Sequence, residues 1–282
     1  MLLIASCCLT MKAQVFRQVN TEKLANSEPG DCRLAGISPD GSYVLTTTQT
    51  NRGLRRTDLK TGVTKQLTDT QGAGFKPHIT ADGRRVICRK VTFDERHLRQ
   101  TALQVLDLEK GTEKTFKAPA RVIRGYEDEA DTKSDAKRAE VFIEDMQLMV
   151  TKDGVTTNIS PNGTDEDTRY IWPSLSPNGQ KILYYVSGEG AYVCNLEGKD
   201  VHFIGHDCRA PQWYDDNTII GMNDRDDGKL LLSSSIMAYT LEGKVQELTD
   251  SSMMLQYPQC CAQQGIIVCS AANGELYVIR TK

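Results

Sequence analysis

The side chains best suited to bind a metal ion or move a proton are four histidines, His78, His97, His202 and His206. His78 lies at the start of a predicted strand and His206 lies in a predicted connection, so these two could face the same opening of the fold. Two imidazoles are too few for a histidine-rich metal site without help from carboxylates. The sequence therefore predicts no metal and no other cofactor, and a metal centre built on His78 and His206 stays an alternative.

Sequence motifs of common enzyme classes are missing from the chain. It contains no G-x-S-x-G nucleophile motif and neither of the glycine-rich loops that bind phosphate or dinucleotides. No C-x-x-C spacing indicates a zinc or redox site. The acidic stretch 223–228 resembles a calcium loop but lacks the complete ligand series and the terminal Glu. The sequence thus favours a role other than catalysis, and leaves an enzymatic one open.

A second group of residues is suited to recognition. Short segments that precede five predicted strands carry Arg, His, Trp or Tyr, and they lie at 31–33, 76–78, 170–173, 207–211 and 257–259. Arginine and aromatic side chains are common in the recognition of carboxylates, sugars and peptides. The predicted ligand-binding residues are Arg33, His78, Arg169, Trp172, Arg209 and Gln212. The alternative is structural: Trp172 would pack between neighbouring sheets and the arginines would brace loops.

The elements that would position these residues recur along the chain. Similar turns, each followed by an apolar strand, have the sequences Ser-Pro-Asp-Gly at 38–41, Thr-Ala-Asp-Gly at 80–83 and Ser-Pro-Asn-Gly at 176–179. Asp-Gly and Asn-Gly pairs tolerate the positive φ angles of a tight hairpin. Weaker copies lie at 213–220 and 261–268, and elements such as Asp-Leu-Lys-Thr-Gly at 58–62 follow downstream. Each unit is therefore predicted to form four antiparallel strands, named a to d in chain order.

The spacing of the units predicts a propeller, because four strands every 40 to 50 residues or so is typical of that architecture. The stretch 118–163 has room for one degenerate unit, with outer strands at 140–150 and 155–159. The predicted fold is all-β, a six-bladed β-propeller of four-stranded antiparallel blades, with five or seven blades as alternatives. The last unit lacks a fourth strand, which an N-terminal strand in 14–20 could supply, closing the ring. The predicted blades span 30–70, 71–117, 118–163, 164–206, 207–250 and 251–282 with 14–20.

The turns at 38–41 and 176–179, the element at 58–62 and the Gln-Leu-Thr-Asp sequence at 66–69 resemble the TolB-like β-propeller repeat family, the WD-like propellers of exported bacterial proteins. The resemblance covers nearly all of 14–282 but includes no counterpart of the TolB N-terminal domain. The repeats are also similar to those of prolyl-oligopeptidase-like propellers and of oligogalacturonate lyases. Resemblance to the lyases implies a metal-assisted polysaccharide lyase-like enzyme at the channel mouth, using His78 and His206, as the alternative function.

Composition excludes some partners. The formal net charge is −3, from 34 basic and 37 acidic residues, so the chain has no electrostatic footprint for nucleic acid. Beyond the N-terminus, no apolar run approaches the roughly 18 residues of a membrane helix. We therefore expect neither a nucleic-acid partner nor a transmembrane span.

The N-terminal residues 1–13 resemble a signal peptide, with an apolar stretch, small residues and predicted cleavage after Ala13. A buried first strand is one alternative, and a lipoprotein signal that anchors Cys7 is another. Seven cysteines follow, an odd number, and a disulfide bond among Cys32, Cys208 and the pair at 260–261 stays open.

Together these features predict a single propeller domain over 14–282, in a periplasmic, secreted or lipid-anchored protein. The predicted function is non-enzymatic binding or scaffolding in the cell envelope. The expected partner is a protein, or a glycan or peptide ligand.

Overall fold

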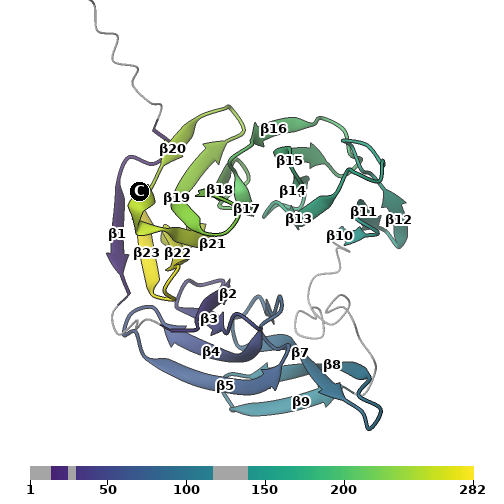
Figure 1. Cartoon of the computed structure of the whole chain (residues 1–282), viewed down its shortest axis with the longest axis vertical. Helices are drawn as coiled ribbons and strands as arrows, with labels where there is room; N and C mark the ends of the chain where they lie inside the picture. The colour runs from purple at the N-terminus through teal and green to yellow at the C-terminus, as the bar shows by residue number, and fades with distance from the viewer. Residues whose placement is uncertain (1–13, 25–29, 117–138) are drawn as a thin grey trace, which may run out of the picture.

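The computed structural model describes residues 14–24, 30–116 and 139–282. Its strands form six antiparallel sheets, which are arranged as blades around a ring (Figure 1). Within the described residues, five sheets have four strands and one has three. The predicted six-bladed β-propeller is therefore confirmed. No helix in the described ranges is long and apolar enough to span a membrane.

Blades 1 and 2 each run from an innermost to an outermost strand in chain order. The strands of blade 1 are β2 (Arg33–Ile37), β3 (Tyr43–Thr47), β4 (Arg52–Asp58) and β5 (Thr64–Gln71). The strands of blade 2 are β6 (His78–Ile79), β7 (Arg85–Phe93), β8 (Arg99–Asp107) and β9 (Thr112–Phe116).

Blades 4 and 5 repeat this order on the other side of the ring. The strands of blade 4 are β13 (Tyr170–Leu175), β14 (Lys181–Val186), β15 (Gly190–Asn195) and β16 (His202–Gly205). The strands of blade 5 are β17 (Arg209–Trp213), β18 (Thr218–Asp226), β19 (Leu231–Thr240) and β20 (Val245–Glu247). The hairpins β7–β8 and β18–β19 are the longest, with strands of 9 or 10 residues. They belong to opposite blades of the ring.

The repeated turns between strands a and b are held by their own polar side chains. In blade 1, the Gly41 N–H donates to the Ser38 carbonyl at 2.9 Å, and Gly41 has a φ of 66°. Asp40 Oδ1 accepts from the amide and the hydroxyl of Ser42. The hydrogen bond from the Ser38 side chain, and then those from Ser42, favour the ionised form and hold the pKa of Asp40 below its ordinary value. Blade 2 has an equivalent turn at Asp82.

Blade 3 differs from its prediction. Its described strands are β10 (Glu140–Glu144), β11 (Gln147–Lys152) and β12 (Val155–Asn158), whereas one continuous strand was expected over 140–150. Asp145 and Met146 both have positive φ angles, of 48° and 64°. Two consecutive positive φ angles make a tight two-residue hairpin, which divides the expected strand. The first part of this predicted blade, 118–138, lies outside the described residues.

Blade 6 closes the ring. It contains β21 (Leu255–Cys261), β22 (Ile266–Ala271), β23 (Leu276–Thr281) and, on its outer edge, β1 (Val19–Lys23), with short 3-10 turns at Ser251–Met253 and Ala262–Gln264. Strand β1 pairs antiparallel with β23, from Val19 opposite Thr281 to Lys23 opposite Tyr277. Closure by an N-terminal strand is confirmed, although this strand begins later than the segment 14–20 suggested.

The residues before β1 bind to the ring in a different way. The amides of Val15 and Phe16 both donate to Oε1 of Gln246 in blade 5. Phe16 is buried between blades 5 and 6, where its ring meets Tyr214 edge-on at 5.0 Å. The apolar side chains at 15 and 16 therefore anchor the chain end instead of starting the strand.

The core is distributed between blades. Five hydrophobic clusters fill the seams between blades 6 and 1, 1 and 2, 3 and 4, 4 and 5, and 5 and 6. Burying one Leu, Ile or Val side chain contributes roughly 1.5–3 kcal/mol, so each seam holds its two blades together. The described residues form no such cluster between blades 2 and 3, which residues 117–138 connect in the chain.

Candidate functional site

Because successive strands of a blade run in opposite directions, two sets of loops lie at the same end of the ring. Strand a starts at this end and strand b returns to it, so the b–c hairpins lie beside the connections that enter strand a. Hydrogen bonds confirm the neighbourhood: Gly74 N, before β6, donates to the carbonyl of Asn51 in the β3–β4 loop. Likewise Gly30 N donates to the Asn273 carbonyl in the β22–β23 loop. We call this end of the ring the channel mouth.

The inner strands share an irregular backbone at the channel mouth. The residue before a proline has a positive φ in four blades, at Lys76, Trp172, Ala210 and Tyr257, with φ between 45° and 52°. Three of these positions, in β13, β17 and β21, coincide with a shift in strand register. Proline has no N–H for the sheet, and a bulge redirects the neighbouring side chain. A repeated backbone feature thus sets which side chains the inner strands present at the mouth.

Two of the predicted ligand-binding arginines have partners within the protein. Arg33, at the start of β2, donates from Nη2 to Oδ1 of Asn51. Arg209, at the start of β17, lies 3.2 Å from Asp224 and 3.9 Å from Asp226. The Asp224 side chain is only 7% exposed, and burial raises its pKa although Arg209 opposes that rise. Each arginine therefore binds a side chain of its own blade at the channel mouth.

Trp172 and Gln212 lie in the inner strands. Trp172 packs against the clusters of both seams of blade 5, and its ring meets Tyr185 edge-on at 5.3 Å. This is the packing role that the sequence offered as an alternative. Gln212 is half-buried in β17, opposite Ile220 of β18.

The remaining predicted residues, Arg169, His78 and His206, lie in blades 2 and 4 and the connection after blade 4. Arg169 is exposed directly before β13, where its carbonyl accepts from Ser187 N at 2.9 Å. His78 is the first residue of β6. His206 lies between β16 and β17, with Nδ1 2.5 Å from the Glu189 carbonyl oxygen. Across the described part of the chain, no three His, Cys, Asp or Glu side chains gather as metal ligands.

The cysteines are buried or partly buried. All seven within the described residues are free thiols, so the disulfide that the sequence left open is not formed there. Burial raises the pKa values of Cys88 and Cys194 to about 12. These two thiols are protonated at neutral pH and are poor nucleophiles.

A group of cations at the mouth of blade 2 was not predicted from the sequence. It consists of Lys76, Arg89 and Arg99, with Phe75 beside them. Lys76 shares its place before proline with Trp172, Ala210 and Tyr257, and this pattern could have indicated it. Arg89 and Arg99 come from the β7–β8 hairpin, and nothing in their local sequence marks them.

The two long hairpins expose apolar side chains at the channel mouth. Phe93 and Leu98 are 62% and 57% exposed at the end of β7–β8, and Leu230 and Leu232 are 68% and 56% exposed at the end of β18–β19. The acidic stretch 223–228 forms part of the second hairpin, where Asp227 Oδ1 accepts from the amides of Lys229 and Leu230. Large apolar side chains exposed on protruding hairpins are typical of an interaction surface.

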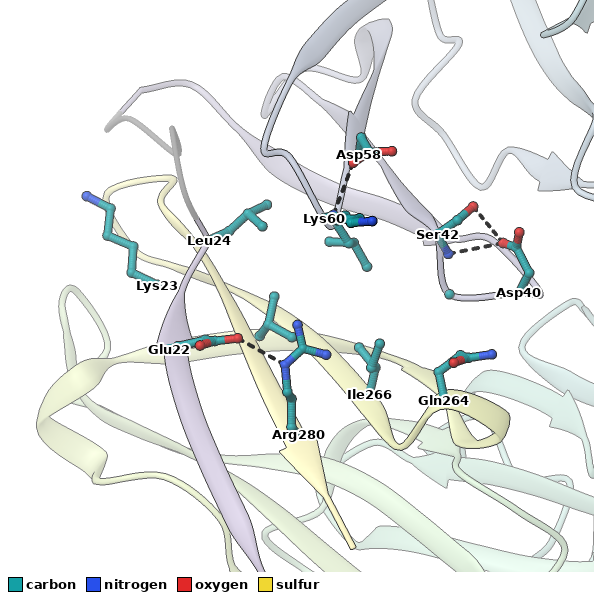
Figure 2. Close-up of a pocket in the computed structure, with 13 residues that line it drawn as sticks. Glu22, Lys23, Leu24, Asp40, Ser42, Asp58, Lys60, Gln264, Ile266 and Arg280 are labelled. Atoms are coloured by element: carbon teal, nitrogen blue, oxygen red, sulfur yellow. Dashed lines mark hydrogen bonds and ion pairs between the residues drawn. The ribbon is translucent and has the colours of Figure 1, made fainter.

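A pocket of about 620 Å³ lies at the opposite end of the ring, between blades 6 and 1. Figure 2 shows one wall carrying Asp40, Asp58 and Lys60 from the turns of blade 1, and the other carrying Glu22, Ile266 and Arg280. Glu22 and Arg280 form an ion pair at 3.0 Å. Asp58 accepts hydrogen bonds from the amides of Lys60 and Thr61. The carboxylates thus serve the turns and the closing strand, and none of the predicted ligand-binding residues lines this pocket.

Comparison with known proteins shows the fold. No family model and no curated protein matches the chain. An oligogalacturonate lyase in complex with manganese has 13% identity and a TM-score of 0.54, covering 94% of this chain and 96% of the lyase. The β-propeller domain of the Trilobed protease from Pyrococcus furiosus has 14% identity and a TM-score of 0.56, covering 88% of this chain and 95% of that domain.

TolB from Acinetobacter baumannii is a more distant match, at 11% identity and a TM-score of 0.43 over 91% of this chain and 55% of TolB. These identities are low and the neighbours differ in function, so the similarity is one of propeller fold. Membership of the TolB-like family stays a prediction from the repeat sequences.

Proposed function

We propose that this protein is an exported, non-enzymatic binding propeller of the cell envelope that holds its partner at the channel mouth. The observation that carries the proposal is the pair of long hairpins on opposite blades, which expose Phe93, Leu98, Leu230 and Leu232. Exposing apolar side chains of this size to water is unfavourable, and covering them with a partner lowers the free energy. A protein partner fits such a surface better than a glycan does, because three of these four side chains are leucines, which offer a sugar neither hydrogen bonds nor an aromatic face.

The proposal of export depends on residues 1–13. They lie outside the described residues, so the sequence alone supports it. The alternative of a metal-assisted lyase needs further ligands beside His78 and His206. The described residues supply no three-ligand group, and the resemblance to a lyase extends only to the fold. Metal-assisted cleavage therefore stays the alternative, and the exposed hairpin side chains are what support the proposal of binding.

The experiment is affinity capture from an envelope extract of the source cells, with residues 14–282 as bait. The test variant is Leu230→Ser/Leu232→Ser. The matched control is Val63→Ser/Val155→Ser, which changes two residues that are equally exposed, at 62% and 66%, in other hairpins of the ring. We expect a protein that the wild type and the control retain at least about tenfold better than the test variant. Equal retention by all three baits would contradict the proposal, provided that their melting temperatures agree.

A further inference from the structure

The cations at the mouth of blade 2 surround an aromatic ring. The guanidinium carbon of Arg89 lies 4.5 Å from the centre of the Phe75 ring. Lys76 follows Phe75 directly, and its positive φ of 47° turns this segment at the entrance to β6. Arg99 starts β8, opposite Phe93, on the strand that pairs with the strand carrying Arg89. Three cations therefore lie along one side of the mouth of blade 2, with Arg89 near enough to both Lys76 and Arg99 to interact with their charges.

This positive charge is not balanced by acidic groups. No ion pair joins Lys76, Arg89 or Arg99 to a carboxylate among the described residues. Partial desolvation, and then the charge of Arg89, lower the pKa of Lys76, although much of this residue is exposed to solvent. Burial, and then the charge of Arg99, lower the pKa of Arg89. Lys76 and Arg89 thus each lie near a like charge, and an anion bound between the cations would relieve this repulsion.

Two arginines of the neighbouring blades 1 and 2 each have a hydrogen-bond donor without a partner. Nε of Arg89 is buried without a hydrogen-bond partner in the structure, and so is Nε of Arg33. A buried donor left without a partner costs about 1–3 kcal/mol, so such donors normally have a ligand or a water molecule. Arg33 belongs to the same neighbourhood, because Asn51 accepts from its side chain and, through the backbone, from Gly74.

We propose that Lys76, Arg89 and Arg99, with Arg33 beside them, form a binding site for a small oxyanion that carries at least two negative charges. A guanidinium group presents paired N–H donors that match the oxygens of a carboxylate or a phosphate. The lysine adds a point charge, and the ring of Phe75 holds Arg89 in place. The site goes beyond the proposed function, because it shares no residue with the exposed apolar side chains that are proposed to hold the partner.

The test is isothermal titration of residues 14–282 with pyrophosphate and, separately, with citrate, at low and moderate salt. We expect one of the two to bind, and its identity tells whether the site prefers phosphate or carboxylate oxygens. Arg89→Met should weaken binding at least about tenfold, and Arg99→Met, a change at an exposed residue, should weaken it several-fold. The matched control is Arg84→Met, which removes an exposed arginine at the a–b turn of the same blade.

A second measurement separates loss of the site from loss of the fold. Without anion, Arg89→Met should melt at or above the wild-type temperature, because it removes an uncompensated charge. With anion, only the wild type and Arg84→Met should gain in melting temperature. The proposal is overturned if neither anion binds at millimolar concentration, or if Arg84→Met weakens binding as much as Arg89→Met. This result is independent of the capture experiment, which changes no residue of this site.

Discussion

Arg209 shows how a residue suited to ligand recognition can instead serve the fold. Its guanidinium group lies beside Asp224, whose side chain is almost fully buried and whose Oδ1 has no hydrogen-bond partner. A buried carboxylate needs a nearby positive charge more than an exposed arginine needs a carboxylate. We infer that the pair holds the β18–β19 hairpin against the inner strand β17.

Arg209→Met should lower the free energy of unfolding by about 1–3 kcal/mol at pH 7, because it leaves Asp224 buried and unpaired. Urea denaturation measures this loss. The loss should shrink as the pH falls from 7 towards 4, because Asp224 has a raised pKa and becomes protonated over this range. An unchanged unfolding midpoint at pH 7 would show that Arg209 is not a brace and is available for ligand.

Asp224→Asn tests the same pair through pH. Burial raises the folded-state pKa of Asp224 above its unfolded value, so the folded state binds the proton more tightly. Its contribution is therefore most favourable below about pH 4 and is lost as pH rises through the raised pKa. We expect the free energy of unfolding of Asp224→Asn, relative to wild type, to increase between pH 4 and 7. A difference that is flat over this range would contradict the assignment.

The elements were predictable where a local signal determines them. The Ser-Pro-Asp-Gly turn predicts its hairpin, because its Asp and Gly are visible in the sequence. In the structure the glycine has a φ near +66° and the Asp accepts the hydrogen bonds of the turn. The hairpin of blade 3 was missed, because Asp145-Met146 contains no glycine although both residues have positive φ angles. The cation group at Arg89 was missed for another reason: it depends on how a hairpin and a connection pack together, which spacing alone does not encode.

The N-terminal segment gives a prediction at the scale of an element. Phe16 is 9% exposed and fills the seam between blades 5 and 6, so Phe16→Ala should lower the free energy of unfolding by about 3 kcal/mol. Thermal melting measures it, with Arg17→Ala as the control at the neighbouring, exposed position. If the two variants have the same melting temperature, the segment before β1 does not contribute to closure of the ring.

Over the whole molecule, the chain closes a ring from repeats that cannot bury their own faces. The sequence predicted six units and N-terminal closure, because five units carry a turn signal, the spacing leaves room for a sixth, and the last unit lacks a strand. It did not predict the position of β1, since Val15 and Phe16 have a strand-like pattern but pack between blades. Antiparallel blades then place the inner-strand connections and the b–c hairpins at one end, whatever the individual sequences.

The two ends of the ring therefore differ: we propose that the partner binds at the channel mouth, whereas the opposite end carries the a–b and c–d turns and the pocket beside the closing strand. Site-specific photo-crosslinking in the envelope extract tests this proposal most directly. Benzoylphenylalanine would replace Leu232 at the mouth or, in a matched protein, Val63 in the turn between β4 and β5. We expect a discrete cross-linked protein with the probe at 232 and none at 63. A discrete product at 63 with none at 232 would contradict the proposal.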